Sequence, residues 1–144
     1  MVEQGEMTQV LERTPLFRGL GKRQLERLAR RFVEREYEAG EAIVTQGQGG
    51  AGFFVLVSGE AEALLERGDG STTSLNPLGP DAFFGEMALL TDAVRSASVV
   101  AKTPVTCLVL TRWDFLSILK EDAEMAVSVL QELASRFSRV MSSL

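Results

Sequence analysis

The sequence contains no histidine and only one cysteine, Cys107. Without histidine the chain has no imidazole base and no histidine ligand for zinc or haem. One thiol forms neither an internal disulfide nor a thiolate cluster for a metal or an iron–sulfur centre. Cys107 itself lies in an apolar run, where a small buried side chain is expected. These absences exclude most enzyme chemistries, so we expect no catalytic residues, no metal and no cofactor.

Long apolar runs and positive charge are also scarce. No run approaches the roughly 20 apolar residues that a helix needs to span a bilayer, and residues 1–6 lack the basic-then-apolar order of a secretory signal. The net charge of −5 disfavours nucleic acid as the main partner, because phosphate backbones attract cationic surfaces. We therefore expect a cytoplasmic protein whose partners include neither a membrane nor a nucleic acid.

What remains is the composition of an ordinary globular domain. With 144 residues, of which 45% are hydrophobic and 24% charged, one core and a single domain over residues 1–144 are expected. The pattern divides the chain into an N-terminal helical segment (1–33), a central region of strands (34–110) and C-terminal helices (111–144). The predicted fold class is α+β, mainly β.

The N-terminal segment has apolar residues at helical spacing in two stretches. Residues 7–20 predict a short helix broken at Pro15, and residues 21–32 predict a second helix. Five basic side chains surround the second helix. We interpret them as a solvated face partly balanced by nearby glutamates, with a docking surface as the alternative. They are Lys22, Arg23, Arg27, Arg30 and Arg31.

From about Phe32 the apolar period changes to two, and glycine-rich turns separate short runs. Such runs, with no long helix between them, predict an antiparallel eight-stranded β-roll, or jelly roll. The four glycines between residues 47 and 52 lack the lysine and the following helix of a phosphate loop, so they predict a tight turn. The seven distinct runs are 32–37, 42–45, 53–58, 60–65, 71–78, 96–101 and 105–111.

Residues 111–144 predict two helices, the second of which follows Asp122 and extends roughly 33 Å. Its apolar residues alternate in steps of four and three, as in the seam of a coiled coil. Packing on the roll of the same chain explains the first half of this stripe. For the last turns, packing against a partner protein or a second copy is equally open. The stripe consists of Ala126, Leu130, Leu133, Phe137, Val140 and Leu144.

The stretch 84–99 carries the functional chemistry. It places Gly85 and Glu86 at the start of a short apolar helical turn and follows them with Arg95 and Ser96. Free amides at a helix start and an arginine bind a phosphate, and a carboxylate accepts hydrogen bonds from sugar hydroxyls. The pattern therefore predicts a site for an anion that carries a polyol.

Residues 84–99 resemble the phosphate-binding cassette of the cyclic nucleotide-binding domain, whose pattern is F-G-E-x-A-L followed by R-x-A-[ST]-V. Bacterial catabolite activators, regulatory subunits of protein kinase A and cyclic nucleotide-gated channels share this domain. The segments 40–43 and 54–60 are similar to its first strands, and the resemblance covers about residues 14–140. It is nearest to prokaryotic channel-type domains and implies a stand-alone module that binds a 3′,5′-cyclic nucleotide.

The resemblance implies a role for each cassette residue. Arg95 would pair with the exocyclic oxygens of the cyclic phosphate. Glu86 would accept a hydrogen bond from the ribose 2′-hydroxyl, with the Gly85 amide beside the same sugar. The backbone amides of Met87 and Ala88 would add donors to the phosphate.

The remaining implied roles concern contact with the base and signalling. Ser96 stands where many relatives have a Ser or Thr that touches the phosphate, and a serine there is compatible with either purine. Leu89 matches the apolar hinge that relays occupancy to the C-terminal helices. Arg136 and Arg139 are candidates to cover the base, or are solvated positions on an amphipathic helix. We favour cAMP over cGMP as the ligand.

Three functions are consistent with these residues. The first is a non-catalytic sensor in which bound nucleotide repositions the C-terminal helices. The second is the sensory fragment of a longer transcription regulator or ion channel, although a sequence running from Met1 to Leu144 fits a stand-alone protein. The third, hydrolysis of the nucleotide, lacks both a histidine and a metal-ligand cluster. A domain that has lost its ligand, with Arg95 and Glu86 as a structural ion pair, is a further alternative.

Overall fold

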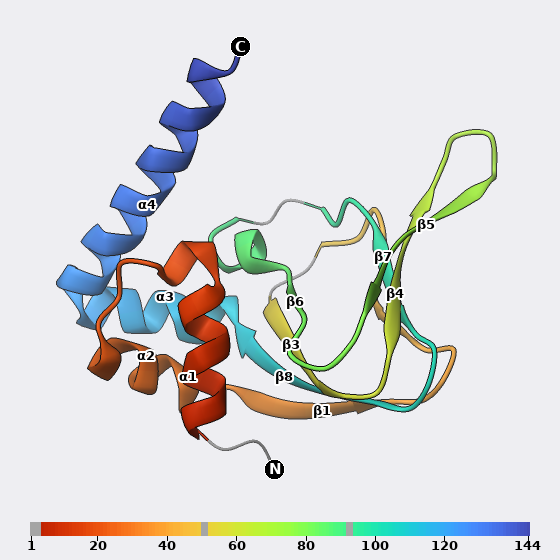
Figure 1. The fold of residues 1–144 in the computed structure, drawn as a ribbon, viewed down its shortest axis with the longest axis horizontal. Coiled ribbons are helices and arrows are strands. Elements are labelled where there is room, and N and C mark those ends of the chain that lie inside the picture. The colour runs from red at the N-terminus through yellow and green to blue at the C-terminus, as the bar shows by residue number, and fades with distance from the viewer. Residues whose placement is uncertain (1–3, 50–51, 92–93) are drawn as a thin grey trace. The chain divides into compact units, whose positions relative to one another are not determined.

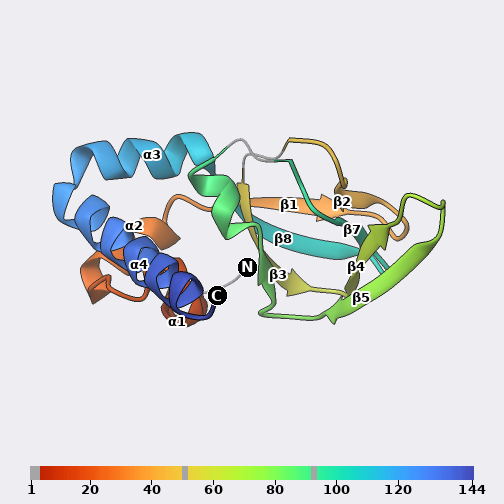
Figure 2. The same ribbon diagram turned by 90° about the horizontal axis from the view of Figure 1, so that it is seen from above.

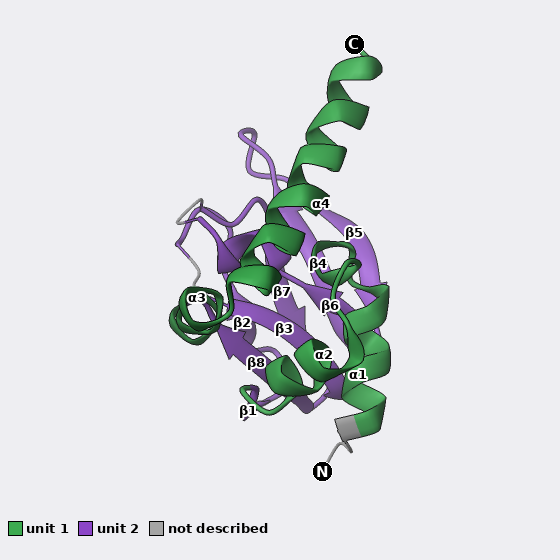
Figure 3. Ribbon diagram, turned by 90° about the vertical axis from the view of Figure 1, so that its left-hand side faces the viewer, with its two compact units in different colours: residues 1–31, 113–144 green, residues 32–112 purple. Residues whose placement is uncertain are grey.

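The computed structural model describes residues 4–49, 52–91 and 94–144. The chain divides into two compact units, which Figure 3 draws in different colours. Unit 1 combines both ends of the chain, Met1–Arg31 and Trp113–Leu144, whereas unit 2 is the continuous segment Phe32–Arg112. The long helices come from the two ends of the sequence and the strands from its middle (Figure 1).

Unit 2 is built from strands. Among its described residues, eight strands form two four-stranded sheets, in the orders β1-β8-β3-β6 and β2-β7-β4-β5. Every neighbouring pair is antiparallel, which confirms the predicted roll. β1 and β8 lie side by side, with Val33 opposite Val109 (Figure 2). The strands are β1 (Val33–Tyr37), β2 (Ala42–Val44), β3 (Gly52–Ser58), β4 (Ala61–Glu66), β5 (Thr72–Leu78), β6 (Phe83–Phe84), β7 (Ser98–Ala101) and β8 (Val105–Thr111).

The seven predicted runs correspond to all of these strands except β6. The largest difference in their limits is at β7, which begins at Ser98 rather than at Ser96. β6 has no predicted counterpart, because Phe83 and Phe84 alone are too short to show a period. This short strand pairs with β3 and leads directly into the cassette.

The core of unit 2 lies between its two sheets. Alternate residues of β3 and β8, such as Phe54 and Leu56 or Cys107 and Val109, belong to one buried cluster with Val99 of β7. Side chains alternate along a strand, so the residues with period two share the inner face. Cys107 is buried there, as predicted, and its burial raises the pKa of the thiol to about 11.

Unit 1 is helical and has its own buried contacts. The rings of Phe17 and Phe115 lie 5.7 Å apart between centroids. The buried hydroxyl of Thr14 donates to the carbonyl of Val10 at 3.1 Å, just before Pro15 interrupts the helix. The predicted break at this proline is thereby confirmed. The elements are α1 (Gln4–Arg13), η1 (Pro15–Phe17), α2 (Lys22–Ala29), α3 (Arg112–Glu121, in unit 1 from Trp113) and α4 (Ala123–Ser142).

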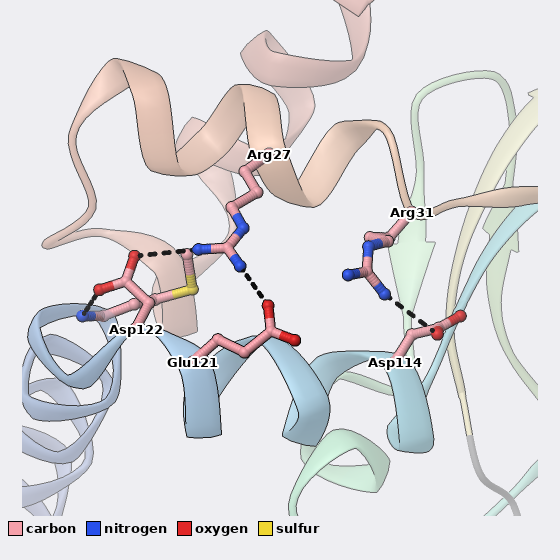
Figure 4. A network of polar contacts seen from close by, with 6 residues as sticks. Arg27, Arg31, Asp114, Glu121 and Asp122 are labelled. Atoms are coloured by element: carbon pink, nitrogen blue, oxygen red, sulfur yellow. Dashed lines mark hydrogen bonds and ion pairs between the residues drawn. The ribbon is translucent and has the colours of Figure 1, made fainter.

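Ion pairs join α2 and the residue Arg31 after it to both ends of α3 and to the start of α4 (Figure 4). Arg27 lies 2.6 Å from a carboxylate oxygen of Glu121 and 3.7 Å from one of Asp122. Arg31 lies 3.4 Å from Asp114. The other oxygen of Asp122 accepts a hydrogen bond from the Met125 amide at 3.0 Å and caps α4. Arg27 and Arg31, which were predicted to belong to a solvated face, therefore form ion pairs with acidic residues of the C-terminal helical region.

The face that α4 buries is not the predicted stripe. Met125 and Val129 are the buried residues of this helix, whereas Leu130 and Phe137 of the stripe are 64% and 66% exposed. In the first half of the stripe, which was expected to pack on the chain's own roll, Ala126 and Leu133 are half-buried and Leu130 is exposed, whereas the apolar residues of the last turns are all exposed. None of the helices formed by the described residues is long and apolar enough to cross a membrane.

Candidate functional site

The site begins at a tight turn after β6. Gly85 has a φ of 87° and precedes η2 (Glu86–Leu89), a 3₁₀ turn where a short helix was predicted. A Cβ atom on Gly85 would lie 2.5 Å from a guanidinium nitrogen of Arg95 and 2.7 Å from the carbonyl oxygen of Gly52. Only glycine satisfies both the positive φ and the lack of space. The Ala88 amide donates to the Gly85 carbonyl at 3.0 Å and closes the turn.

The backbone of Arg95 is held by the glycine-rich turn after β2. Its amide donates to the Gln48 carbonyl, and its carbonyl accepts from the Gly47 amide, both at 2.8 Å. Gly49 and Val94 form an isolated antiparallel bridge beside them. The predicted turn therefore pairs with the second half of the cassette; the third of its four glycines, Gly50, lies outside the described residues.

The guanidinium group of Arg95 is partly buried and lacks an acidic partner. Nη2 donates to the Gly52 carbonyl at 2.9 Å, and the guanidinium carbon lies 5.8 Å from the centroid of the Phe54 ring. Nε is buried and has no hydrogen-bond partner. Among residues 4–49, 52–91 and 94–144, no carboxylate forms an ion pair with Arg95. Burial lowers the pKa of the guanidinium below its usual value.

The described residues of unit 2 surround a cavity of about 340 Å³ beside this arginine. That volume lies at the small end of the range for small-molecule sites. All six residues predicted to bind ligand line it: Gly85, Glu86, Met87, Ala88, Arg95 and Ser96. The structure thus brings the two ends of the cassette together at one cavity. The other lining residues, Val44, Phe84, Thr91, Val94, Ala97 and Val99, are mostly apolar.

The predicted hinge and base-covering residues do not line the cavity. Leu89 is fully buried at the end of η2. Arg136 is half-buried and Arg139 exposed on α4, which belongs to unit 1. The roles of these three residues remain predictions.

Two residues that contact Arg95 have no predicted role in the site. Gly52 supplies the carbonyl that Arg95 contacts, and the Phe54 ring lies under the guanidinium. Phe54 stacks on Phe84 with 5.0 Å between centroids and 1° between planes. Phe54 lies in a predicted strand run, but Phe84 lies in none, so the sequence does not indicate that β3 and β6 pair beside this arginine.

Comparison with known proteins identifies the family. The family described as Cyclic nucleotide-binding domain matches residues 34–122. The Cyclic AMP receptor protein of Thermus thermophilus is 33% identical over 123 residues, which are 85% of this chain and 57% of that protein. The chain therefore spans little more than half the length of this curated relative.

Solved structures agree with the sequence match. The N-terminal domain of a transcriptional regulator from Streptomyces coelicolor superposes with a TM-score of 0.84 and 27% identity, over 94% of each chain. The regulatory domain of Toxoplasma gondii PKA, solved with cAMP, gives a TM-score of 0.71 and 27% identity, over 84% of this chain and 46% of that one. The resemblance deduced from the cassette is confirmed: the chain belongs to the cyclic nucleotide-binding domain family.

Proposed function

We propose that the cavity of unit 2 binds a 3′,5′-cyclic nucleotide and that the chain acts as a sensor without catalytic activity. The observation that carries this proposal is the state of Arg95. Its Nε is buried without an acceptor, and no carboxylate of the described residues neutralises its charge. An unpaired cation is costly even when it is only partly buried, and a phosphate would supply both the charge and the missing acceptors.

The other cavity residues take roles around this phosphate. Glu86 accepts the ribose 2′-hydroxyl, with the amide of Gly85 beside the sugar, and the Met87 amide and Ser96 hydroxyl donate to the phosphate. The Ala88 amide already donates to Gly85 within the turn, so it contributes to the phosphate only if that hydrogen bond is shared or opened. A deoxyribose ligand would leave the carboxylate without its partner and bind more weakly.

We further propose that cAMP is preferred over cGMP. The relative from Thermus thermophilus is named for cyclic AMP, and the domain of Toxoplasma gondii PKA was solved with cAMP. Ser96, which follows the arginine, is compatible with either purine and does not decide this preference. Arg136 or Arg139 would cover the base.

Occupancy of the site would reach the C-terminal helices through Leu89. A ligand shifts such an equilibrium only by its difference in affinity for the two states. The exposed apolar residues of α4 would then bind a partner protein or a second copy of the chain in one state. The stripe includes Leu130, Phe137, Val140 and Leu144, each more than half exposed.

Isothermal titration calorimetry of the protein with cAMP, cGMP and 2′-deoxy-cAMP tests the binding proposal. We expect the tightest dissociation constant for cAMP. Arg95→Ala should weaken binding at least tenfold, because a hydrogen bond to a charged group contributes about 1.5–3 kcal/mol. Absence of heat with every ligand at millimolar concentration would refute nucleotide binding. Loss of cAMP on long incubation with the protein would refute the non-catalytic role.

A second candidate function is the sensory part of a longer transcription regulator. The observation that favours it is the match over 94% of each chain with the N-terminal domain of such a regulator. An intact mass of the protein from its native source distinguishes a stand-alone sensor from a part of a larger regulator or channel.

A further inference from the structure

We propose that Phe54, stacked on Phe84, is a positioning residue that holds the Arg95 guanidinium in its binding orientation before any ligand arrives. This inference rests on the proposed function of the cavity. It adds a residue that does not line the cavity and that the cassette pattern does not include.

The guanidinium group of Arg95 lies over the ring of Phe54. The guanidinium carbon lies 5.8 Å from the Phe54 centroid, within the distance at which the face of an aromatic ring attracts a cation. The ring itself cannot swing away, because Phe54 is only 8% exposed and stacks on Phe84 with 1° between the planes. The two rings come from neighbouring strands, with Phe54 opposite Phe84 in the β3–β6 ladder.

Gly52 completes the support from the same strand. Its carbonyl accepts the hydrogen bond from Nη2 of Arg95. A Cβ atom at Gly52 would lie 3.6 Å from the Phe54 ring and 3.1 Å from a methyl group of Val109. The contact with the ring would be an ordinary one and the contact with Val109 a tight one, so glycine at this position serves the close packing of β3 against β8.

A ring and one carbonyl suit an anion site better than a carboxylate would. A carboxylate would neutralise the guanidinium and occupy two of its donors. An aromatic face attracts the charge without accepting its in-plane N–H groups. Of the guanidinium nitrogens of Arg95, only Nη2 donates a hydrogen bond to a described residue, so the arginine keeps both its charge and most of its guanidinium donors for a phosphate.

Substitutions at position 54 measure how much the Phe54 ring contributes to cAMP affinity. Phe54→Leu should weaken cAMP binding about three- to tenfold, the scale of a partly desolvated cation–π contact, whereas Phe54→Tyr should stay within about twofold of wild type. Phe53→Leu is the matched control, since Phe53 is also buried in β3 but its ring contacts Phe32 and Phe83. It should leave the cAMP dissociation constant within about twofold.

Because Phe54 also belongs to the core of unit 2, two further measurements separate positioning from packing. Phe54→Leu introduced into Arg95→Gln should change cAMP affinity less than about twofold, since the ring acts through the guanidinium. Phenylalanines with one, two and three ring fluorines at position 54 keep the shape of the side chain but weaken the ring quadrupole. Affinity should fall stepwise along this series.

The inference would be overturned if Phe54→Leu lowered cAMP affinity equally in the wild-type protein and in Arg95→Gln. It would also be overturned if cAMP affinity did not change along the fluorine series. The fluorine series keeps the test decisive if Phe54→Leu does not fold. Failure of the wild-type protein to bind cAMP would instead overturn the proposed function. The two failures are therefore distinguishable.

Discussion

Gly85 meets two separate requirements at one carbon atom. Its φ of 87° disfavours any L side chain, and a Cβ atom there would lie 2.5 Å from Arg95 and 2.7 Å from the Gly52 carbonyl. The first requirement concerns stability and the second concerns the position of the guanidinium. Alanine substitutions at two glycines can separate the two requirements. Another glycine of the chain also has a positive φ, but no atom lies near its Cβ position.

Gly85→Ala should weaken cAMP binding at least about tenfold, because Arg95 must move away from its position on Gly52, and should cost about 1–3 kcal/mol of stability. Gly70→Ala is the control. Gly70 has the same φ of 87° but no atom within 4 Å of its Cβ position, so backbone strain should appear without loss of affinity. Calorimetry and urea unfolding of both variants measure the two effects; equal affinities would contradict the steric role of Gly85.

The candidate site shows which residues a sequence can reveal. Gly85, Glu86 and Arg95 lie within one short stretch whose residue types fit an anion and a sugar, so the stretch alone predicts them. Gly52 and Phe54 act through a carbonyl oxygen and a ring face. Neither property distinguishes them from other strand residues, and both contacts with Arg95 depend on tertiary structure, which brings the distant Arg95 beside the start of β3.

At the scale of elements, the side chain of Asp122 caps the start of α4 and also forms an ion pair with a residue of α2. One oxygen caps α4 at the Met125 amide, and the other lies 3.7 Å from Arg27 of α2. Arg27 also pairs with Glu121 at the end of α3. The start of α4 is thus fixed by a backbone hydrogen bond and by an ion pair at the same carboxylate.

Asp122→Ala should lower the free energy of unfolding by about 1–2 kcal/mol, because it removes both the helix cap and an ion pair. Arg27→Ala should cost less, about 0.5–1 kcal/mol, since partly exposed ion pairs contribute little. Arg30→Ala, whose exposed side chain forms no ion pair in the described parts of the chain, should stay within about 0.5 kcal/mol. Urea denaturation of the three variants orders these effects, and an Arg30 loss as large as that of Asp122 would contradict the assignment.

The same elements show where periodicity fails as a guide to the fold. The limits of the strands with a buried inner face were predicted to within two residues. The alternation of apolar and polar side chains that marks such strands can be read from local sequence alone. The two-residue β6 is too short for any period. For α4, apolar residues cover more than one face, and the buried face of Met125 and Val129 is decided by tertiary packing that the spacing does not encode.

For the whole molecule, the buried thiol of Cys107 sets a pH dependence of stability. Its pKa is raised from 9.0 to about 11 by burial among the apolar residues between the sheets. The folded state therefore favours the neutral thiol. Below pH 9 the thiol is neutral in both states and its contribution is constant; above pH 9 the unfolded chain releases the proton first.

The free energy of unfolding should accordingly be unaffected by this group up to pH 9 and decline because of it between pH 9 and about 11. Cys107→Ala removes the group, so its stability should depend less steeply on pH over this interval, whatever the cost of the lost side chain. Urea unfolding of both proteins at several pH values measures the two slopes. Parallel slopes would show that Cys107 does not contribute.

The register of β1 against β8 has a consequence for protein engineering. β1 begins at Val33, β8 ends at Thr111, and Val33 stands opposite Val109. The chain therefore enters and leaves unit 2 at neighbouring points of one sheet. Insertions into a host protein succeed when their two ends lie close together. Residues 32–112 have the geometry of a transplantable module, one that would occupy a surface turn of a foreign scaffold without stretching it.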